Sequence, residues 1–408
     1  MKFVTLALVL MTAVSASAKD IKLTSKSARR TYIQKATVWQ TPPQDLTAKD
    51  IYDGPAAKGY AKLLQNDRVY CQTTEEDQTG DFGGATPKFY CQLLKPISGN
   101  QFEYIVKDDG DRRVVKVKYN PPGRQNREIQ GELIGTRLLW ALGFYADQMF
   151  YVDEVYCYGC TKDPFKTRRV VSDNPKAGNI FNGTAIEKKL SGDKVMSEYR
   201  VSDAQRQRDP SLPEKAWSAG VEFKEMMRNL PETGRNEQII QRDALRLLAI
   251  FMNHIDLKSE NQRMVCTETN DKDQCTQAIM MIQDIGTSFG VTLSKEALRL
   301  KKVDLHTWSS TPIWQDPARC VALLTKNPAA PLFVPDWSML TPKISNAGRV
   351  FLAKLLTDFS KDRRRVEALF RAGRVDNSEL DGWVNAFISK VNQIRFPLGT
   401  ASPDFRCQ

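Results

Sequence analysis

The sequence predicts a mixed α+β protein with a β-rich N-terminal part and a mainly helical C-terminal part. Short runs rich in β-branched and aromatic residues alternate with turn residues between Arg68 and Tyr119. From Ala216 onward, apolar residues recur at helical spacing. Two strand-like runs interrupt this second part at residues 262–283, where we expect a β-hairpin.

The first eighteen residues have the composition of a secretory signal peptide. Lys2 precedes an apolar run from Phe3 to Val14, and residues 16–18 read Ala-Ser-Ala, which is typical of a cleavage site. The apolar run is too short for a permanent membrane anchor, and no later stretch is long and apolar enough to span a bilayer. We therefore expect a periplasmic or secreted protein that loses residues 1–18.

We assign the β-rich part to residues 19–152 and the helical part to residues 153–408. In the first part, turn residues separate the runs, and antiparallel hairpins are the simplest arrangement. The predicted strands are 68–71, 88–93, 102–106, 114–119 and 149–152. An apolar stripe predicts one helix at Glu128–Leu142, with Gly143 as its stop.

The helical part contains the most regular helix pattern of the chain, at residues 237–253. Two further amphipathic helices are expected at about 348–358 and 381–394. Residues 19–60 are weakly periodic, and residues 161–215 are polar and irregular apart from a hairpin around 184–195.

Eight cysteines in an exported chain predict disulfides. Proximity in the sequence suggests three pairs and elimination leaves a fourth: Cys71–Cys91, Cys157–Cys160, Cys266–Cys275 and Cys320–Cys407. For Cys157 and Cys160 we also considered a zinc site or a redox pair. Zinc would need two more ligands at matching spacing, and the chain has only His254 and His306. A thioredoxin-like site would need a βαβ context that this region lacks, so we predict a structural disulfide.

The chain is basic, with 59 Lys and Arg against 48 Asp and Glu, a formal charge of +11 that becomes +10 without Lys2. Such a charge favours anionic partners such as phosphates, although a solvated basic surface is the simpler interpretation. No basic run is interleaved with aromatic residues, so we expect no nucleic-acid partner. The densest cluster, Arg363–Arg365, is expected on the solvent face of a helix. We expect a monomer.

The segment His254–Asn261 reads His-Ile-Asp-Leu-Lys-Ser-Glu-Asn. It resembles the protein-kinase catalytic loop, His-Arg-Asp-Leu-Lys-Pro-Glu-Asn, and differs only at the second and sixth positions. The resemblance implies a two-lobed protein-kinase-like fold and phosphoryl transfer. It also implies that Asp256 activates the acceptor hydroxyl, that Lys258 neutralises the transferring phosphate and that Asn261 holds a metal ion.

After the two predicted strands, Asp284-Ile-Gly286 resembles the family's Asp-Phe-Gly, whose Asp binds the metal that bridges the phosphates. The cofactors implied are ATP and Mg²⁺ or Mn²⁺. Upstream, Lys118 is similar to the strand lysine that pairs the nucleotide phosphates. Lys116 points to the same face, and Lys118 is preferred for its place at the strand end.

Glu132, on the following helix, is the expected ion-pair partner of that lysine, with Glu128 one turn earlier as the alternative. Gly83 and Gly84, in the glycine-rich run that begins at Gly80, are the candidates for the loop that covers the phosphates.

The chain also departs from the family. It lacks Gly-x-Gly-x-x-Gly and an Ala-Pro-Glu segment, and Ile255 replaces the usual Arg. These departures point to an atypical branch, such as the lipid kinases, the secretory-pathway kinases or exported bacterial kinase-like proteins. The resemblance covers residues 80–290.

We therefore expect an exported kinase-like phosphotransferase with an acceptor that the sequence leaves open. The alternative is a non-catalytic, pseudokinase-like exported binding protein, because ATP is scarce outside the cytoplasm. Asp256 and Asn261 also have an ordinary interpretation as turn and capping residues. His254 is expected to be a core residue, and no hydrolase motif is present.

Overall fold

The computed structural model describes most of the chain from residue 20 onward: residues 20–55, 68–75, 78, 87–97, 102–105, 114–201, 207, 213–231, 234–271, 274–294, 299–301, 303–326, 336–399 and 405–407. The predicted signal peptide (1–18) and two predicted site residues, Gly83 and Gly84, lie outside the described residues. The described part is a mixed α+β structure, as the sequence predicts.

The strands fall into one larger sheet, a second sheet built around a hairpin, and two short pairs. They are β1 (Ile21–Leu23), β2 (Arg68–Gln72), β3 (Lys88–Pro96), β4 (Phe102–Tyr104), β5 (Val114–Lys118), β6 (Gln148–Tyr158), β7 (Gly178–Lys188), β8 (Asp193–Arg200), β9 (Lys215–Ser218), β10 (Gln262–Thr269), β11 (Cys275–Ile282), β12 (Thr292–Ser294), β13 (Arg299–Lys301), β14 (Trp314–Asp316) and β15 (Val321–Ala322).

The helices are concentrated in the second half of the chain. They are α1 (Lys26–Lys35), α2 (Ala48–Asp53), α4 (Arg127–Ala141), α5 (Pro164–Thr167), α7 (Phe223–Arg228), α8 (Arg235–Phe251), α9 (Leu305–Ser310), α10 (Asn346–Ser360), α11 (Arg363–Ala372) and α12 (Leu380–Arg395), with short 3₁₀ helices η2 (Ser259–Asn261) and η4 (Trp337–Met339).

The larger sheet closes on itself. Its strand order is β2-β6-β7-β5-β3-β4, and β2 also pairs with β3, so five strands form a ring with β4 attached to β3. Alternate residues of these strands, among them Val69, Phe89, Val117 and Val155, fill the interior of the ring. Lys118 ends β5 at the edge of this barrel, and α4 packs on its outside through Ile129 and Leu133.

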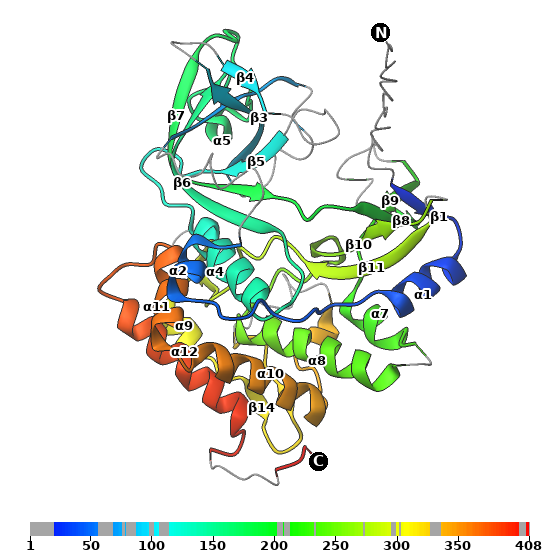
Figure 1. Ribbon diagram of the computed structural model, residues 1–408. Coiled ribbons are helices and arrows are strands. Elements are labelled where there is room, and N and C mark those ends of the chain that lie inside the picture. The colour runs from blue at the N-terminus through cyan, green and yellow to red at the C-terminus, as the bar shows by residue number, and fades with distance from the viewer. Residues whose placement is uncertain are drawn as a thin grey trace, which may run out of the picture.

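The second sheet has the order β1-β8-β10-β11, with β9 beside β8. The antiparallel hairpin β10–β11, predicted from the sequence at residues 262–283, forms one end of this order, and β10 also pairs with β8. Figure 1 shows this hairpin and α4 between the barrel at one end and helices α8 to α12 at the other. The turn after the hairpin reaches the strand that carries Lys118, because Asp284 Oδ1 lies 2.8 Å from Lys118 Nζ.

The N-terminal segment crosses the helical part rather than joining the barrel (Figure 1). Ile33, Val38 and Ile51 are fully buried in the same core as α8, α10 and α12. The buried guanidinium of Arg242, on α8, donates hydrogen bonds to the backbone oxygens of Ile33 (2.7 Å) and Ala36 (3.3 Å). Residues 20–53, which the sequence analysis groups with the β-rich part, thus help to build the helical core.

The strongest sequence patterns predict elements that the structure contains, most of them within a few residues at each end, although β6 continues to Tyr158, well beyond the predicted end at residue 152. The predicted strands correspond to β2 to β6, β10 and β11, and the predicted helices to α4, α8, α10 and α12. Arg363 and Arg364 are exposed at the start of α11, as expected. The irregular character predicted for residues 161–215 is wrong, because β7 runs for eleven residues and pairs with β6 along its length. The boundary predicted at residue 152 stays a prediction and falls inside β6.

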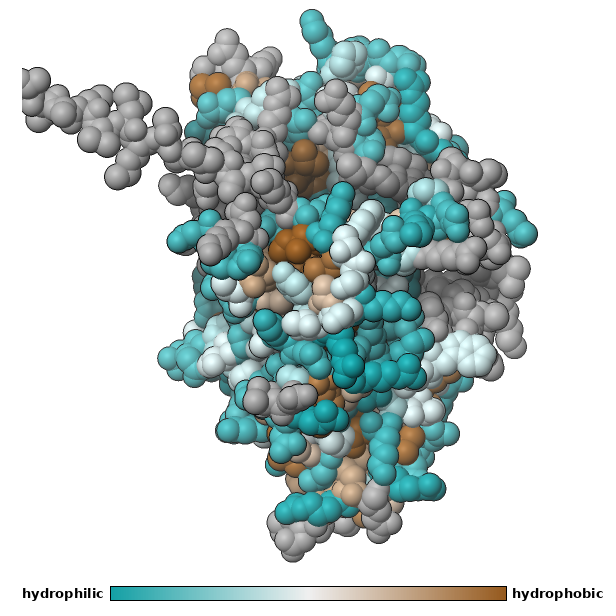
Figure 2. Space-filling model, turned by 90° about the vertical axis from the view of Figure 1, so that its right-hand side faces the viewer, coloured by the Kyte–Doolittle hydropathy of each residue, from teal (hydrophilic) through white to brown (hydrophobic). Residues whose placement is uncertain are grey.

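All four predicted cysteine pairs are disulfide-bonded in the structure. This usage fits an exported protein. The described residues contain no helix that combines the length and apolar character needed to cross a membrane. The face in Figure 2 is mostly hydrophilic, with small apolar patches.

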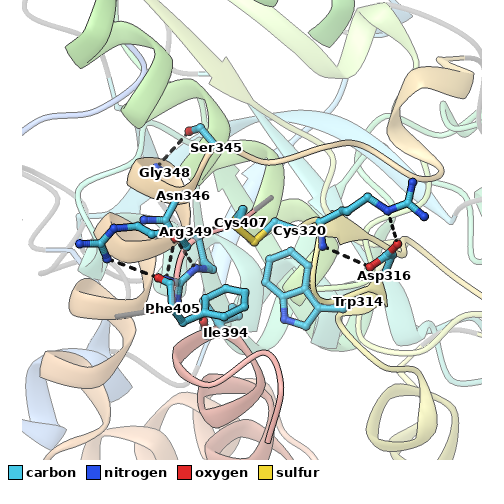
Figure 3. The surroundings of a disulfide bond; sticks show 12 residues. Trp314, Asp316, Cys320, Ser345, Asn346, Gly348, Arg349, Ile394, Phe405 and Cys407 are labelled. Carbon is cyan, nitrogen blue, oxygen red and sulfur yellow. Dashed lines mark hydrogen bonds and ion pairs between the residues drawn. A yellow bond between two sulfur atoms is a disulfide. The ribbon is translucent and has the colours of Figure 1, made fainter. Parts of the chain in front are cut away.

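The Cys320–Cys407 disulfide ties the C-terminal tail to the base of the helical part (Figure 3). Beside it, the Arg349 guanidinium donates a hydrogen bond to the Ile394 carbonyl oxygen (3.0 Å) and lies 5.1 Å from the ring centre of Phe405. The tail, the start of α10 and the end of α12 are therefore held together.

Removing this disulfide should destabilise the protein more than removing a short-range one. Its sequence separation is 87 residues, for which unfolded-chain entropy predicts a loss of about 4.5 kcal/mol in the free energy of unfolding. The separation of 9 residues for Cys266–Cys275 predicts about 2.5 kcal/mol. Urea unfolding of the two double Cys→Ser variants measures both losses, and an equal or larger loss for Cys266–Cys275 would contradict the prediction.

Candidate active site

Lys118 places a buried ammonium group against three carboxylates from two other segments. Its Nζ lies 2.5 Å from Glu132 Oε1, 2.8 Å from Asp284 Oδ1 and 3.3 Å from Glu128 Oε2. Glu128 and Glu132 lie one turn apart on α4, so a single face of that helix presents both. The expected contact between Lys118 and Glu132 is present, and Glu128, the alternative partner, also contacts the lysine.

Burial and the charges of neighbouring groups together set the pKa values of this cluster. Burial disfavours the charge of Lys118, but Asp284, Glu132 and Glu128 hold its pKa well above the usual value. The attraction of Lys118 holds the pKa of Asp284 well below its usual range, against the effect of burial. Burial raises the pKa of Glu132 to about 7, although Lys118 opposes the rise. Near neutral pH, Lys118 and Asp284 are therefore a charged pair. Glu132 is the carboxyl group that is partly protonated.

Asp284 occupies a special backbone position directly after β11. Its φ of 53° lies in the left-handed region, which Asp adopts more readily than most residues. The next residue, Ile285, is fully buried in the main core. This burial anchors the turn, while the Asp284 side chain remains 37% exposed beside the almost fully buried Lys118.

Glycines let this turn approach α4 very closely. A Cβ at Gly131 would lie 2.6 Å from the Gly286 carbonyl oxygen, and one at Gly135 would lie 2.8 Å from Ile285 Cγ2. A Cβ at Gly286 would lie 2.8 Å from Glu128 Cβ. These three glycines fix the distance between the helix that carries the glutamates and the turn that carries Asp284.

The segment predicted as a catalytic loop follows α8 and leads into the hairpin. Asp256 and Lys258 form an ion pair at 3.2 Å, and both side chains are partly exposed. The Asn261 side-chain amide donates to the backbone oxygen of Asp256 at 2.8 Å, which holds the two ends of the loop together. Burial opposes the charge of Lys258, but the neighbouring Asp256 raises its pKa.

His254 is a core residue, as predicted. It is fully buried, and its Nδ1 lies 3.3 Å from the Thr287 carbonyl oxygen and 3.2 Å from Ser288 Oγ. Burial lowers its pKa. The imidazole therefore packs the start of the loop against the segment that follows Asp284.

The two groups of residues meet at the base of the hairpin. The backbone N–H of Gln283, the residue before Asp284, donates to the Asn261 carbonyl oxygen at 2.8 Å. The structure thus brings Lys118, Glu132 and Asp284 into contact and joins them through one backbone bond to the loop that holds Asp256, Lys258 and Asn261. The predicted phosphate-loop residues Gly83 and Gly84 lie outside the described residues.

The second strand lysine has its own partner. Lys116 forms an ion pair with Glu187, which lies directly opposite it on β7. Burial lowers the pKa of Lys116 to about 7, and repulsion from Lys118 and Lys189 adds to the effect. The choice of Lys118 over Lys116 as the phosphate-binding lysine stays a prediction.

Sequence reasoning missed the three glycines and the Lys116–Glu187 pair. The glycines had a detectable signal, because Gly131 and Gly135 lie one turn apart on the same helix as Glu128 and Glu132. Glu187 had no such signal, because it meets Lys116 only through the pairing of two strands about 70 residues apart.

Asn261 and Asp284 stay predicted ligands of a divalent cation. Among the described residues, no group of three or more His, Cys, Asp or Glu side chains is arranged to hold a metal. Asn261 and Asp284 offer amide and carboxylate oxygens of the kind Mg²⁺ and Mn²⁺ accept, and Mg²⁺ commonly keeps water and phosphate oxygens as its other ligands. The partial exposure of Asp284 leaves access for such an ion.

Comparison with known proteins adds little to this geometry. No protein-family model matches the chain, and no curated protein matches it. Among solved structures, the crystal structure of the proinflammatory kinase CtkA of Helicobacter pylori matches with a TM-score of 0.36 and 7% sequence identity. The match covers 80% of this chain and 92% of that one. At this TM-score the likeness decides neither fold nor function, which rest on the contacts described above.

Replacing Gly131 with Ala should disturb the turn of Asp284. The added Cβ meets a backbone oxygen that cannot rotate away, so we expect the free energy of unfolding to fall by about 1–3 kcal/mol, despite the higher helix propensity of Ala. Gly382→Ala is the matched control, because its nearest neighbour is the flexible end of Leu305. Urea unfolding tests both variants, and equal stability of Gly131→Ala and the wild type would contradict the close packing.

Proposed function

We propose that the protein is an exported kinase-like phosphotransferase that uses ATP with Mg²⁺ or Mn²⁺. One observation carries the proposal: Lys118, Glu132 and Asp284 converge, and Asp284 follows directly on the residue bonded to Asn261. A buried lysine held by carboxylates, beside a more exposed Asp and an Asn, is an arrangement suited to polyphosphate and its metal ion. The four disulfides are consistent with work outside the cytoplasm.

Each residue then has one task. Lys118 binds phosphate oxygens, and Glu132 keeps the lysine aligned. Asn261 and Asp284 hold the divalent ion, which supplies charge neutralisation at the phosphates when bound. Lys258 offers a positive charge to the transferring group.

Asp256 serves as the proton acceptor. The oxygen of the acceptor hydroxyl forms a bond to the γ-phosphorus, the bond from that phosphorus to the bridging oxygen of ADP breaks, and the hydroxyl proton passes to Asp256. The nature of the acceptor, whether protein, lipid, sugar or the chain itself, is open in this proposal.

Ligand-dependent stability tests the binding half of the proposal. At an Mg-ATP concentration about 100 times its Kd, the folded protein should gain about 2.7 kcal/mol, seen as a higher melting temperature. Asp284→Ala should abolish this gain. Asp173→Ala, at an exposed surface ion pair, is the control and should keep it. No shift in the wild type would sink the proposal.

A phosphoryl-transfer assay distinguishes a kinase from a non-catalytic nucleotide-binding protein. With labelled ATP and Mn²⁺, the wild type should place label on itself or on an added acceptor. Asp256→Asn should keep the thermal shift but lose transfer by at least about 100-fold, because general-base catalysis contributes about that much. A thermal shift without transfer in the wild type would assign the non-catalytic alternative.

A further inference from the structure

A second charged cluster lies next to the candidate site and links its two halves. It consists of Lys116, Asp147, Glu187, Lys189 and Gln283, here called the bridge cluster. Its members come from β5, the segment before β6, the end of β7, the residue after β7 and the residue before Asp284.

Lys189 is the centre of the bridge cluster. Its Nζ lies 2.9 Å from Asp147 Oδ2, donates to Gln283 Oε1 at 3.4 Å and forms an ion pair with Glu187. The Lys189 side chain is 46% exposed, whereas those of Asp147 and Glu187 are 5% and 4% exposed. The partly exposed ammonium group of Lys189 therefore forms ion pairs with two buried carboxylates.

One end of the bridge cluster reaches the strand of Lys118. Glu187 also pairs with Lys116, which faces the same side of β5 as Lys118 and lies two residues before it. The carboxylate of Glu187 therefore lies between a cation of the barrel and Lys189.

The other end reaches the turn of Asp284. The Gln283 side chain accepts from Lys189, its amide nitrogen donates to the Glu260 carbonyl oxygen at 2.6 Å, and its backbone N–H donates to the Asn261 carbonyl oxygen. Asp147 also accepts from the backbone N–H of Leu190 at 2.8 Å, which holds the chain directly after Lys189.

We infer that Lys189 is a positioning residue, which holds the barrel strand carrying Lys118 in register with the turn carrying Asp284. The inference rests on the proposed function, because the register matters for phosphate and metal binding. Exposed ion pairs contribute little to stability, but loss of Lys189 leaves Asp147 without its ammonium partner and Glu187 with Lys116 alone. The Gln283 side chain also loses its link to the barrel.

Two measurements test the inference, the first without any nucleotide. Lys189→Met keeps the length of the side chain but removes its charge. In hydrogen exchange on the free protein, the Gln283 amide of this variant should exchange at least about tenfold faster than in the wild type. Lys215→Met, which removes an exposed ion pair to Glu198 on β8, is the matched control and should leave this exchange unchanged. If the Gln283 amide of Lys189→Met exchanges at the wild-type rate, the inference that Lys189 links the barrel to the turn is overturned.

The second measurement is the Kd for Mg-ATP by calorimetry, well below the melting temperature. Lys189→Met should weaken binding at least about tenfold, Lys189→Arg should restore it to within about threefold, and Lys215→Met should match the wild type. A merely stabilising lysine would lower the melting temperature of Lys189→Met and leave this Kd unchanged, which would overturn the inference. The two measurements also separate the inference from the proposed function. If Gln283 exchanges faster in Lys189→Met but the wild type does not bind Mg-ATP, the proposed function is rejected and, with it, the positioning role.

If Lys189→Met does not fold, Gln283→Met takes its place. That variant keeps both ion pairs of Lys189 and removes the side-chain bonds of Gln283 to Lys189 and to the Glu260 carbonyl oxygen, so it should show the same loss of affinity. Full affinity in Gln283→Met would overturn the inference.

Discussion

The buried ammonium group of Lys118 is the point to which three separate segments of the chain are tied. The barrel supplies the lysine, α4 supplies Glu128 and Glu132, and the hairpin delivers Asp284. Burying an unpaired charge is strongly unfavourable, so each segment is held in place by the need to satisfy the others. Burial raises the pKa of Glu132 to about 7, against the attraction of Lys118, so this carboxyl group is partly protonated near neutral pH.

Close backbone contacts at glycine residues set the geometry of this charge cluster. Gly131 and Gly286 let backbone meet backbone at contact distance, which brings the turn of Asp284 up to α4. On its far side, α4 meets Gly373, where a Cβ would lie 2.3 Å from Ile134 Cγ1. The helix is therefore fitted closely between the turn and the end of α11. A helix held on two sides in this way leaves the glutamates little freedom to move away from the lysine.

Local sequence was enough to predict the parts of the site that are continuous in the chain. The loop 254–261 and the turn at Asp284 follow strongly patterned elements, and their residues are found together. The choice of Lys118 rests on its resemblance to the family's strand lysine and its position at the strand end, because Lys116 lies on the same face of the strand. The bridge cluster could not be predicted in this way, because Asp147, Lys189 and Gln283 meet only after two sheets and α4 have been assembled.

Elements were missed where tertiary contacts outweigh local preference. The sequence of β7 contains two glycines and two asparagines and resembles a loop, yet pairing with β6 and β5 makes it a strand. Helix α1 is largely polar and buries only Ile33. It is held by Ser25 at its N-terminus and by the ion pair of Arg29 with Glu225, almost two hundred residues away. The second partner, Glu225, is not visible in a local window of sequence.

That remote anchoring of the N-terminal segment has a consequence for the order of assembly. Ribosomes release this segment first, but its docking surfaces, including Arg242 and Phe351, are synthesised some two to three hundred residues later. Contacts between residues so far apart in the sequence form slowly. Closing the long loop between them costs conformational entropy before the contacts can stabilise the fold. The segment that emerges earliest is therefore among the last to reach its final place, and until then part of the helical core stays open to solvent.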